Sequence, residues 1–187
     1  SDPGVVPAAR KLERVSFDEM IEMASLGARV LQIRSVLFAR RHGVRIHVRS
    51  TFKPDEGTWV VPEEDLVEQL LVSGVTYNRK EAKIRIVGVK DQPGIAARIF
   101  SPLAEAGIVV DMIVQNLSRD GTTDITFTVP REDYRHALEI SQRTGSAIGA
   151  GEIEGDEGIS KVSIVGLGMK DHAGAANRMF QALADEG

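Results

Sequence analysis

One stretch of sequence decides the fold: IRIVGVKDQPGIAARIFSPLAEAG at residues 84–107 returns as VSIVGLGMKDHAGAANRMFQALADEG at residues 162–187. After a two-residue insertion in the second copy, nine positions are identical at a fixed offset of 80. In the first copy these positions are Lys90, Asp91, Gly94, Ala96, Arg98, Phe100, Leu103, Ala104 and Gly107. Each copy has an alternating apolar pattern, a turn at Asp-x-x-Gly and then apolar residues at helical spacing. The chain is therefore predicted to contain two copies of one module.

The first copy is predicted to continue into a complete domain. Its pattern indicates strands at 108–115, 124–129 and near 147–153, with a helix at 132–143. The resulting order, βαββαβ, is that of the ferredoxin-like α+β fold, in which two helices cover one face of a four-stranded antiparallel sheet. The second copy stops after its strand and helix, so we expect that module to be incomplete in this chain.

A different pattern precedes the repeat. Ser16 and Glu19 have the spacing of a capping box, which predicts a helix that ends at Gly27. A second helix is expected at 30–41 and a strand at 44–49. The inward side chains of that second helix are expected to be Leu31, Val36, Leu37 and Phe38. Helix, helix and strand are too little for a whole α/β domain, so this region is predicted to be the tail of one.

The composition excludes several kinds of site. The 187 residues include no cysteine, which excludes disulfides, thiolate zinc sites and cysteine nucleophiles. The four histidines lack metal-binding spacing, and no P-loop, GxGxxG or GxSxG motif occurs. Apolar runs are only a few residues long, so no membrane contact is expected and the cytoplasm is the default location.

Nucleic-acid binding is also disfavoured. The chain has 23 basic and 27 acidic residues and a net charge of −4. Its basic cluster, from Arg40 to Arg49, has no interleaved aromatic residues, so a solvated helix face is the better interpretation.

The turn between the strand and the helix of the first copy is the best candidate site. Gly94 lets a ligand approach the backbone, and the free amides at the start of the next helix attract an anion. Asp91 adds a negative charge beside that positive helix end, and Gln115 offers an amide that can donate and accept. An α-amino acid carries both charges close together, so its zwitterion suits this turn. Alternatively, Asp91 merely caps the helix and Gly94 merely permits the turn.

These motifs together resemble the aspartate kinase (aspartokinase) family. The end of that family's catalytic domain is similar to DP at 2–3, KL at 11–12, SFDEM at 16–20, ASLGA at 24–28, RSV at 34–36 and HVRS at 47–50. The first of its two ACT modules is similar to GVKDQPGIAA at 88–97, DMIVQN at 111–116 and TTDITFTVP at 122–130. The second is similar to KVSIVG at 161–166 and GMKDH at 168–172.

The resemblance implies a domain order. Residues 1–52 would be the C-terminal tail of an amino-acid-kinase domain, 53–71 a linker, 72–155 the first ACT module and 156–187 the start of the second. The strand near 72–78 is expected to pair with the second module.

The resemblance also implies a regulatory function. The family phosphorylates L-aspartate with ATP and Mg²⁺, and its ACT modules bind lysine, threonine or both where modules of neighbouring chains meet. Homo-oligomers or a catalytic kinase subunit are the implied partners. Family positions place the effector site at Asp91, Pro93, Gly94, Ile95, Ala96, Gln115, Asn116, Ser118 and Thr126.

This chain departs from the family at its start. Asp2 and Pro3 correspond to a remnant of the nucleotide side of the kinase site, but Gly4 replaces the usual arginine. The N-terminal catalytic motif is absent, so no catalytic residue and no cofactor or metal site are expected here, and the chain itself is expected to be inactive. A stand-alone ACT module that binds amino acids or drives assembly, without a kinase partner, is the alternative.

Overall fold

The computed structural model describes residues 2–66, 71–117, 121–171 and 174–186. The chain forms two compact units. The central unit holds residues 79–161, and the two-segment unit combines residues 1–78 with residues 162–187. The central unit contains one sheet and the two-segment unit contains two, and each unit has its own apolar core.

The central unit has the predicted ferredoxin-like fold. Its elements are β5 (Glu81–Lys90), α3 (Ile95–Glu105), β6 (Ile113–Leu117), β7 (Thr122–Pro130), α4 (Tyr134–Ile148) and β8 (Glu152–Asp156), with a short 3₁₀ turn η2 (Arg131–Asp133) before α4. The sheet order is β6-β7-β5-β8, and every neighbouring pair is antiparallel. The predicted βαββαβ order is thus confirmed.

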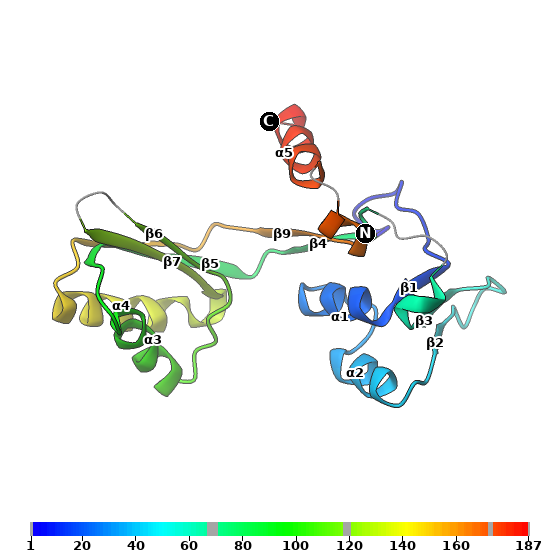
Figure 1. The fold of residues 1–187 in the computed structure, drawn as a ribbon, viewed down its shortest axis with the longest axis horizontal. Coiled ribbons are helices and arrows are strands. Elements are labelled where there is room, and N and C mark those ends of the chain that lie inside the picture. The colour runs from blue at the N-terminus through cyan, green and yellow to red at the C-terminus, as the bar shows by residue number, and fades with distance from the viewer. Residues whose placement is uncertain (1, 67–70, 118–120, 172–173, 187) are drawn as a thin grey trace. The chain divides into compact units, whose positions relative to one another are not determined.

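Helices α3 and α4 cover the same face of this sheet (Figure 1). Between them and the sheet lies the core, in which Ile84, Ile86 and Phe127 are completely buried. Phe100 of α3 meets Phe127 edge to face, with ring centroids 5.3 Å apart. Packing of this kind fixes the sheet register, because a slip of one residue would turn the apolar face to solvent.

Several predicted boundaries in the central unit were wrong. The strand expected at 108–115 begins only at Ile113, and the one expected near 147–153 begins at Glu152. The last helix continues to Ile148, which packs against the core, and ends where Gly149 adopts a left-handed conformation with φ of 72°.

Strand β5 contains a bulge. Ile86 pairs with Ile125 and Val89 pairs with Thr123, so Val87 and Gly88 together lie opposite the single residue Asp124. Gly88 has a φ of 66°, a left-handed conformation that other L-residues rarely adopt.

The two-segment unit contains the capping box that the sequence predicted. Its elements before the repeat are β1 (Arg14–Ser16), α1 (Phe17–Ser25), α2 (Ile33–Arg41), β2 (Ile46–Val48), β3 (Thr58–Val61) and the 3₁₀ turn η1 (Glu63–Asp65). At the start of α1, the Glu19 amide donates to the Ser16 hydroxyl and the Ser16 amide donates to the Glu19 carboxylate. The hydrogen bonds of the box are therefore confirmed.

The linker expected at 53–71 was partly wrong. Residues 58–61 form β3, the middle strand of a sheet with the order β1-β3-β2. The short segment Thr58–Val61 lies between a parallel neighbour, β1, and an antiparallel one, β2, and Val60 is completely buried. This strand is stabilised by pairing with segments that are distant in the sequence. It was not predicted because the residues around it are typical of turns.

The predicted inward face of α2 was also partly wrong. Val36 is completely buried, but Leu37 and Phe38 are 46% and 68% exposed. Each residue of a helix is rotated by about 100° from the previous one, so these two side chains cannot share the face of Val36. Ala39, three residues after Val36, supplies the second buried contact.

The second copy of the repeat lies in the same unit as the N-terminal segment. It forms β9 (Lys161–Val165), the 3₁₀ turn η3 (Leu167–Asp171) and α5 (Ala175–Glu186). Strand β9 pairs with β4 (Gly74–Asn78), and Val165 joins the core that contains Met20 and Met23 of α1. Among the described residues, no helix is long and apolar enough to cross a bilayer.

Candidate functional site

The candidate turn of the first copy has the geometry of an open helix start. Gly94 is the N-cap of α3, with φ of 85°, and no side chain caps the helix. A Cβ on Gly94 would meet nothing within 4 Å, so the conformation, not lack of space, requires glycine here. Because the first amides of a helix have no intrahelical acceptor, this end carries partial positive charge toward solvent.

A hollow of about 410 Å³ lies at this turn. It is lined by Asp91, Gln92, Pro93, Gly94, Ile95, Ala96 and, from strand β6, Gln115. Two segments that are separate in the sequence therefore meet around one space: the β5–α3 turn and strand β6. Apart from Ile95, which is buried, the lining residues are exposed.

Asp91 does not act as a helix cap. Its carboxylate has no hydrogen-bond or ion-pair partner within the described part of the chain, and its backbone amide donates to the Gly121 carbonyl at 3.1 Å. The simple capping interpretation is therefore wrong for Asp91. A free carboxylate, an uncapped helix start and an amide side chain are brought together instead.

The structure places two further predicted site residues, Asn116 and Thr126, outside the lining of this hollow. In the antiparallel pairing of β6 with β7, Asn116 is opposite Asp124 and Thr126 is opposite Val114, whereas Gln115 is opposite the buried Ile125. Since side chains alternate along a strand, Asn116 and Thr126 belong to the face away from the helices. Ser118 lies outside the described residues.

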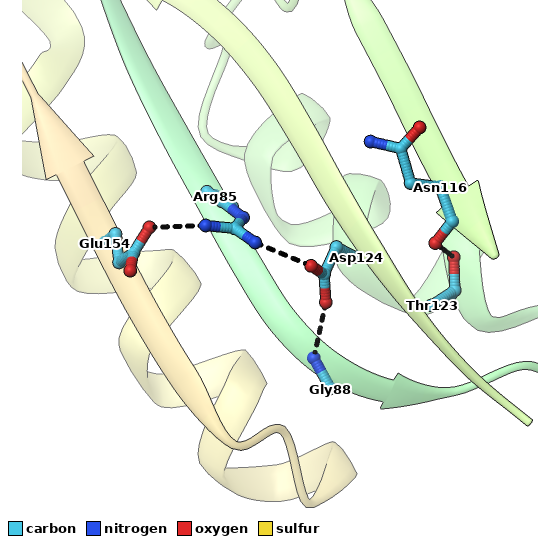
Figure 2. A network of polar contacts seen from close by, with 6 residues as sticks. All are labelled: Arg85, Gly88, Asn116, Thr123, Asp124 and Glu154. Carbon is cyan, nitrogen blue, oxygen red and sulfur yellow. Dashed lines mark hydrogen bonds and ion pairs between the residues drawn. The ribbon is translucent and has the colours of Figure 1, made fainter. Parts of the chain in front are cut away.

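A polar network on that open face was missed by sequence reasoning (Figure 2). The Arg85 guanidinium donates to Asp124 at 2.7 Å and to Glu154 at 3.2 Å, which joins three strands. The other Asp124 oxygen accepts the Gly88 amide at 2.9 Å. Gln92, a lining residue of the hollow, was missed as well. The sequence shows charged residues at alternating positions in the three strands. It does not show the register of the strands, which brings these three charges together.

The network shifts the pKa values of its members. The Gly88 amide, and next the Arg85 guanidinium, hold the pKa of Asp124 below its usual value. In turn the hydrogen bond to Asp124, together with the charge of Glu154, raises the pKa of Arg85. Both groups are therefore charged at neutral pH, and the Asp124 carboxylate is a constant acceptor for Gly88.

The predicted nucleotide remnant does not form a nucleotide site by itself. Asp2 and Pro3 are exposed, and the Asp2 carboxylate accepts the Gly4 amide at 2.8 Å. In the ranges that the structure describes, no group of three or more histidine, aspartate or glutamate side chains could hold a metal ion. These residues alone are no fit for ATP or Mg²⁺.

The two-segment unit has a hollow of its own, of about 340 Å³. His47 and Trp59 stack there with ring centroids 3.8 Å apart, and the His47 Nε2 contacts the Glu56 carbonyl oxygen at 2.6 Å. The full lining is Glu13, Arg14, His47, Arg49, Glu56, Gly57 and Trp59. Two arginines and two glutamates balance, so this hollow favours neither sign of ligand charge.

Comparison with known proteins identifies the family. The ACT domain model matches residues 84–143 and 162–187, and the amino acid kinase family model matches residues 1–50. A crystal structure of aspartokinase alpha and beta subunits is 48% identical, with 62% of this chain and 76% of that chain covered and a TM-score of 0.57. This chain belongs to the aspartokinase family. The predicted resemblance is thereby confirmed.

Other aspartokinases extend the match over the whole chain. The aspartokinase of Pseudomonas aeruginosa is 53% identical over 188 residues, which cover 100% of this chain and 46% of the relative. E. coli aspartokinase III in complex with lysine and aspartate is 25% identical, covering 88% of this chain and 36% of that one, with a TM-score of 0.67. The chain thus spans about half the length of the curated relatives it matches.

Proposed function

We propose that this chain is a regulatory part of an aspartate kinase, and that the hollow at the β5–α3 turn binds lysine or threonine as a feedback inhibitor. The kinase reaction would transfer a phosphoryl group from ATP to the β-carboxylate of L-aspartate. One observation carries the proposal: Asp91, the uncapped start of α3 and Gln115 line the same hollow.

The chemistry of the lining suits an amino-acid zwitterion. The amides in the first turn of α3 that have no intrahelical acceptor would donate hydrogen bonds to the ligand carboxylate. The Asp91 carboxylate would pair with the ligand's ammonium group. Gln115 could bond either group, since its amide both donates and accepts. The same lining would reject a simple anion, because Asp91 would repel it.

The family relationship supports the choice of ligand. A solved E. coli relative is described as a complex with lysine and aspartate. Another solved relative is described as aspartokinase alpha and beta subunits. We propose that in this family member, too, chains associate and that a neighbouring ACT module completes the site. We propose a homo-oligomer or a complex with a catalytic subunit as the working state.

Calorimetric titration with L-lysine and L-threonine, separately and together, tests the proposal. Binding of at least one of them is expected, and Asp91→Asn should weaken it about tenfold or more by removing the partner of the ammonium group. Glu132→Gln, which alters an exposed acidic residue outside the hollow, is the matched control. Equal affinity in wild type and Asp91→Asn would contradict the proposed site.

The alternative, a stand-alone ACT module without a kinase partner, predicts amino-acid binding as well. The match of residues 1–50 to the amino acid kinase family favours the kinase-linked function. We propose that the chain alone does not phosphorylate aspartate. Incubation with ATP, Mg²⁺ and aspartate should then release no ADP above background, and turnover would contradict this part of the proposal.

A further inference from the structure

The bulge in β5 decides which face of the sheet carries Asp91. Side chains alternate along a strand, and Ile84 and Ile86 both point into the core. An uninterrupted strand would continue this face with residues 88 and 90. Instead Val89 is completely buried, because the bulge adds one residue before it. The alternation after the bulge is therefore inverted.

The inverted alternation extends to the turn. Lys90 pairs with Thr122, and the Asp91 amide donates to the Gly121 carbonyl, so the strand continues its register up to the turn. Residue 91 shares the alternation of Val89 and leaves the strand on the helix side, where the hollow lies. Without the bulge, Lys90 would take this place, and the charge presented to the hollow would be reversed.

Asp124 holds the bulge together from the neighbouring strand. Its Oδ1 accepts the Gly88 amide at 2.9 Å, and its Oδ2 is paired with Arg85 at 2.7 Å (Figure 2). Glu154 on β8 holds Arg85 from the other side. The Asp124 side chain thus satisfies the amide that the left-handed Gly88 would otherwise leave without a partner in the ladder.

We propose that Asp124, oriented by Arg85, is a positioning residue for the effector site: through the Gly88 bulge it places Asp91 at the hollow. Asp124 does not line the hollow, so its effect on the ligand is indirect. The identity of the ligand rests on the function proposed above. The link between Asp124, the bulge and the place of Asp91 does not, so the two can fail separately.

The test compares four variants of this chain by amide hydrogen exchange, by NMR shifts of the Gly94 and Gln115 amides, and by calorimetry with L-lysine and L-threonine. Asp124→Ala removes the acceptor and its ion pair with Arg85, and Asp124→Asn keeps an acceptor oxygen. Arg85→Gln removes the ion pairs with Asp124 and Glu154 but leaves the Asp124 acceptor in place. Asp156→Asn is the matched control, because its ion pair with Lys83 lies in the same sheet but does not touch the bulge.

Asp124→Ala should speed exchange of the Gly88 amide, move the Gly94 and Gln115 amide shifts, and weaken effector binding roughly tenfold, as loss of one charge-assisted hydrogen bond does. Asp124→Asn should keep Gly88 protected and retain most of the affinity, Arg85→Gln should lie between the two, and Asp156→Asn should match wild type. Unchanged Gly88 exchange in Asp124→Ala would overturn the proposal, and so would faster exchange with unchanged affinity.

Two further outcomes remain informative. If wild type binds neither amino acid, the proposed ligand is wrong. Hydrogen exchange of the Gly88 amide and the NMR shifts of the Gly94 and Gln115 amides then still show whether Asp124 positions the turn. If Asp124→Ala does not fold, Arg85→Gln decides it: faster Gly88 exchange and moved Gly94 and Gln115 shifts support the proposal, and unchanged values overturn it.

Discussion

The two copies of the repeat begin alike and differ after their strands. In the first copy, β5 passes through the bulge at Gly88 and continues to Lys90 before the turn. In the second, β9 ends at Val165, and a 3₁₀ turn at Leu167–Asp171 takes up the two-residue insertion. Similar sequences therefore lead into their helices by different routes.

The neighbours of each strand explain the difference. β5 lies between β7 and β8, and Asp124 of β7 holds the Gly88 amide. β9 pairs with β4, and the Leu167 amide after it donates to Glu19 of α1 at 3.3 Å. The repeat specifies a strand, a turn and a helix, whereas the partner strands and helices determine the geometry of the turn.

The largest expected effect is a difference in stability between alanine variants of Gly88 and Gly166, which occupy equivalent positions in the two copies of the repeat. A Cβ on Gly166 would lie 2.3 Å from the Leu71 carbonyl oxygen, so Gly166→Ala must displace backbone and should lower the free energy of unfolding by about 3 kcal/mol. Gly88 has room for a Cβ but needs its left-handed φ, so Gly88→Ala should cost about 1–2 kcal/mol.

Asparagine variants at the same two positions, compared by urea denaturation, test the reason for each loss of stability. Because asparagine tolerates the left-handed conformation better than alanine, Gly88→Asn should be milder than Gly88→Ala. Gly166→Asn should be at least as harmful as Gly166→Ala, because space is limiting there. Equal rescue at both positions would contradict the distinction.

Glu19 should matter for the second copy and not for the first. This buried carboxylate accepts hydrogen bonds from the Ser16 amide, the Ser73 hydroxyl and the Leu167 amide. Glu19→Gln places a donor among these donors and should lower the free energy of unfolding of the two-segment unit by about 1–3 kcal/mol.

Hydrogen exchange locates the effect of Glu19→Gln. The Leu167 amide should exchange faster while the Gly88 amide is unchanged. Glu22→Gln, at an exposed position on the same helix, is the control and should alter neither amide. Loss of protection at Gly88 would show that the two turns are not held separately.

The smallest expected effect is a dependence on pH at the first turn. The pKa of Asp124 is lowered in the folded state, first by the Gly88 amide and then by Arg85, so its stabilising contribution is complete above the ordinary aspartate value of about 3.9. It is lost as the pH falls through the lower folded-state pKa.

Protection of the Gly88 amide, corrected for intrinsic exchange, should therefore be constant from pH 7 to about 4 and decrease only below that range. In Asp124→Asn, which has no charge to lose, the additional decrease in acid should be absent. A decrease that begins well above the ordinary aspartate range would contradict the role given to Asp124.

Much of the fold, and the group of residues that lines the candidate site, could be predicted from the sequence. The repeat predicted the βαββαβ order, and Asp91, Gly94 and Gln115 were predicted to meet at one turn, where they line the hollow. Periodicity and turn chemistry, which are properties of short segments, predicted the elements and the turn. The topology of a known fold then placed Gln115 beside that turn.

The remainder depends on contacts between distant segments. The bulge at Gly88 could not be predicted, because it needs the register of β5 against Asp124 of β7. Strand β3 was not predicted, because it lies in a segment rich in turn residues and is stabilised by pairing with β1 and β2. Asn116 and Thr126 were grouped with the hollow by family position, whereas strand alternation places them on the opposite face.

One measurement tests the central claim most directly: NMR titration of the ¹⁵N-labelled chain with L-lysine and with L-threonine. The account predicts saturable shifts of the Gly94, Ala96 and Gln115 amides with at least one of the two, and none at Gly166 or Leu167. Shifts confined to the second turn, or no shift at Gly94 in a folded sample, would contradict the claim that the first copy of the repeat forms the effector site.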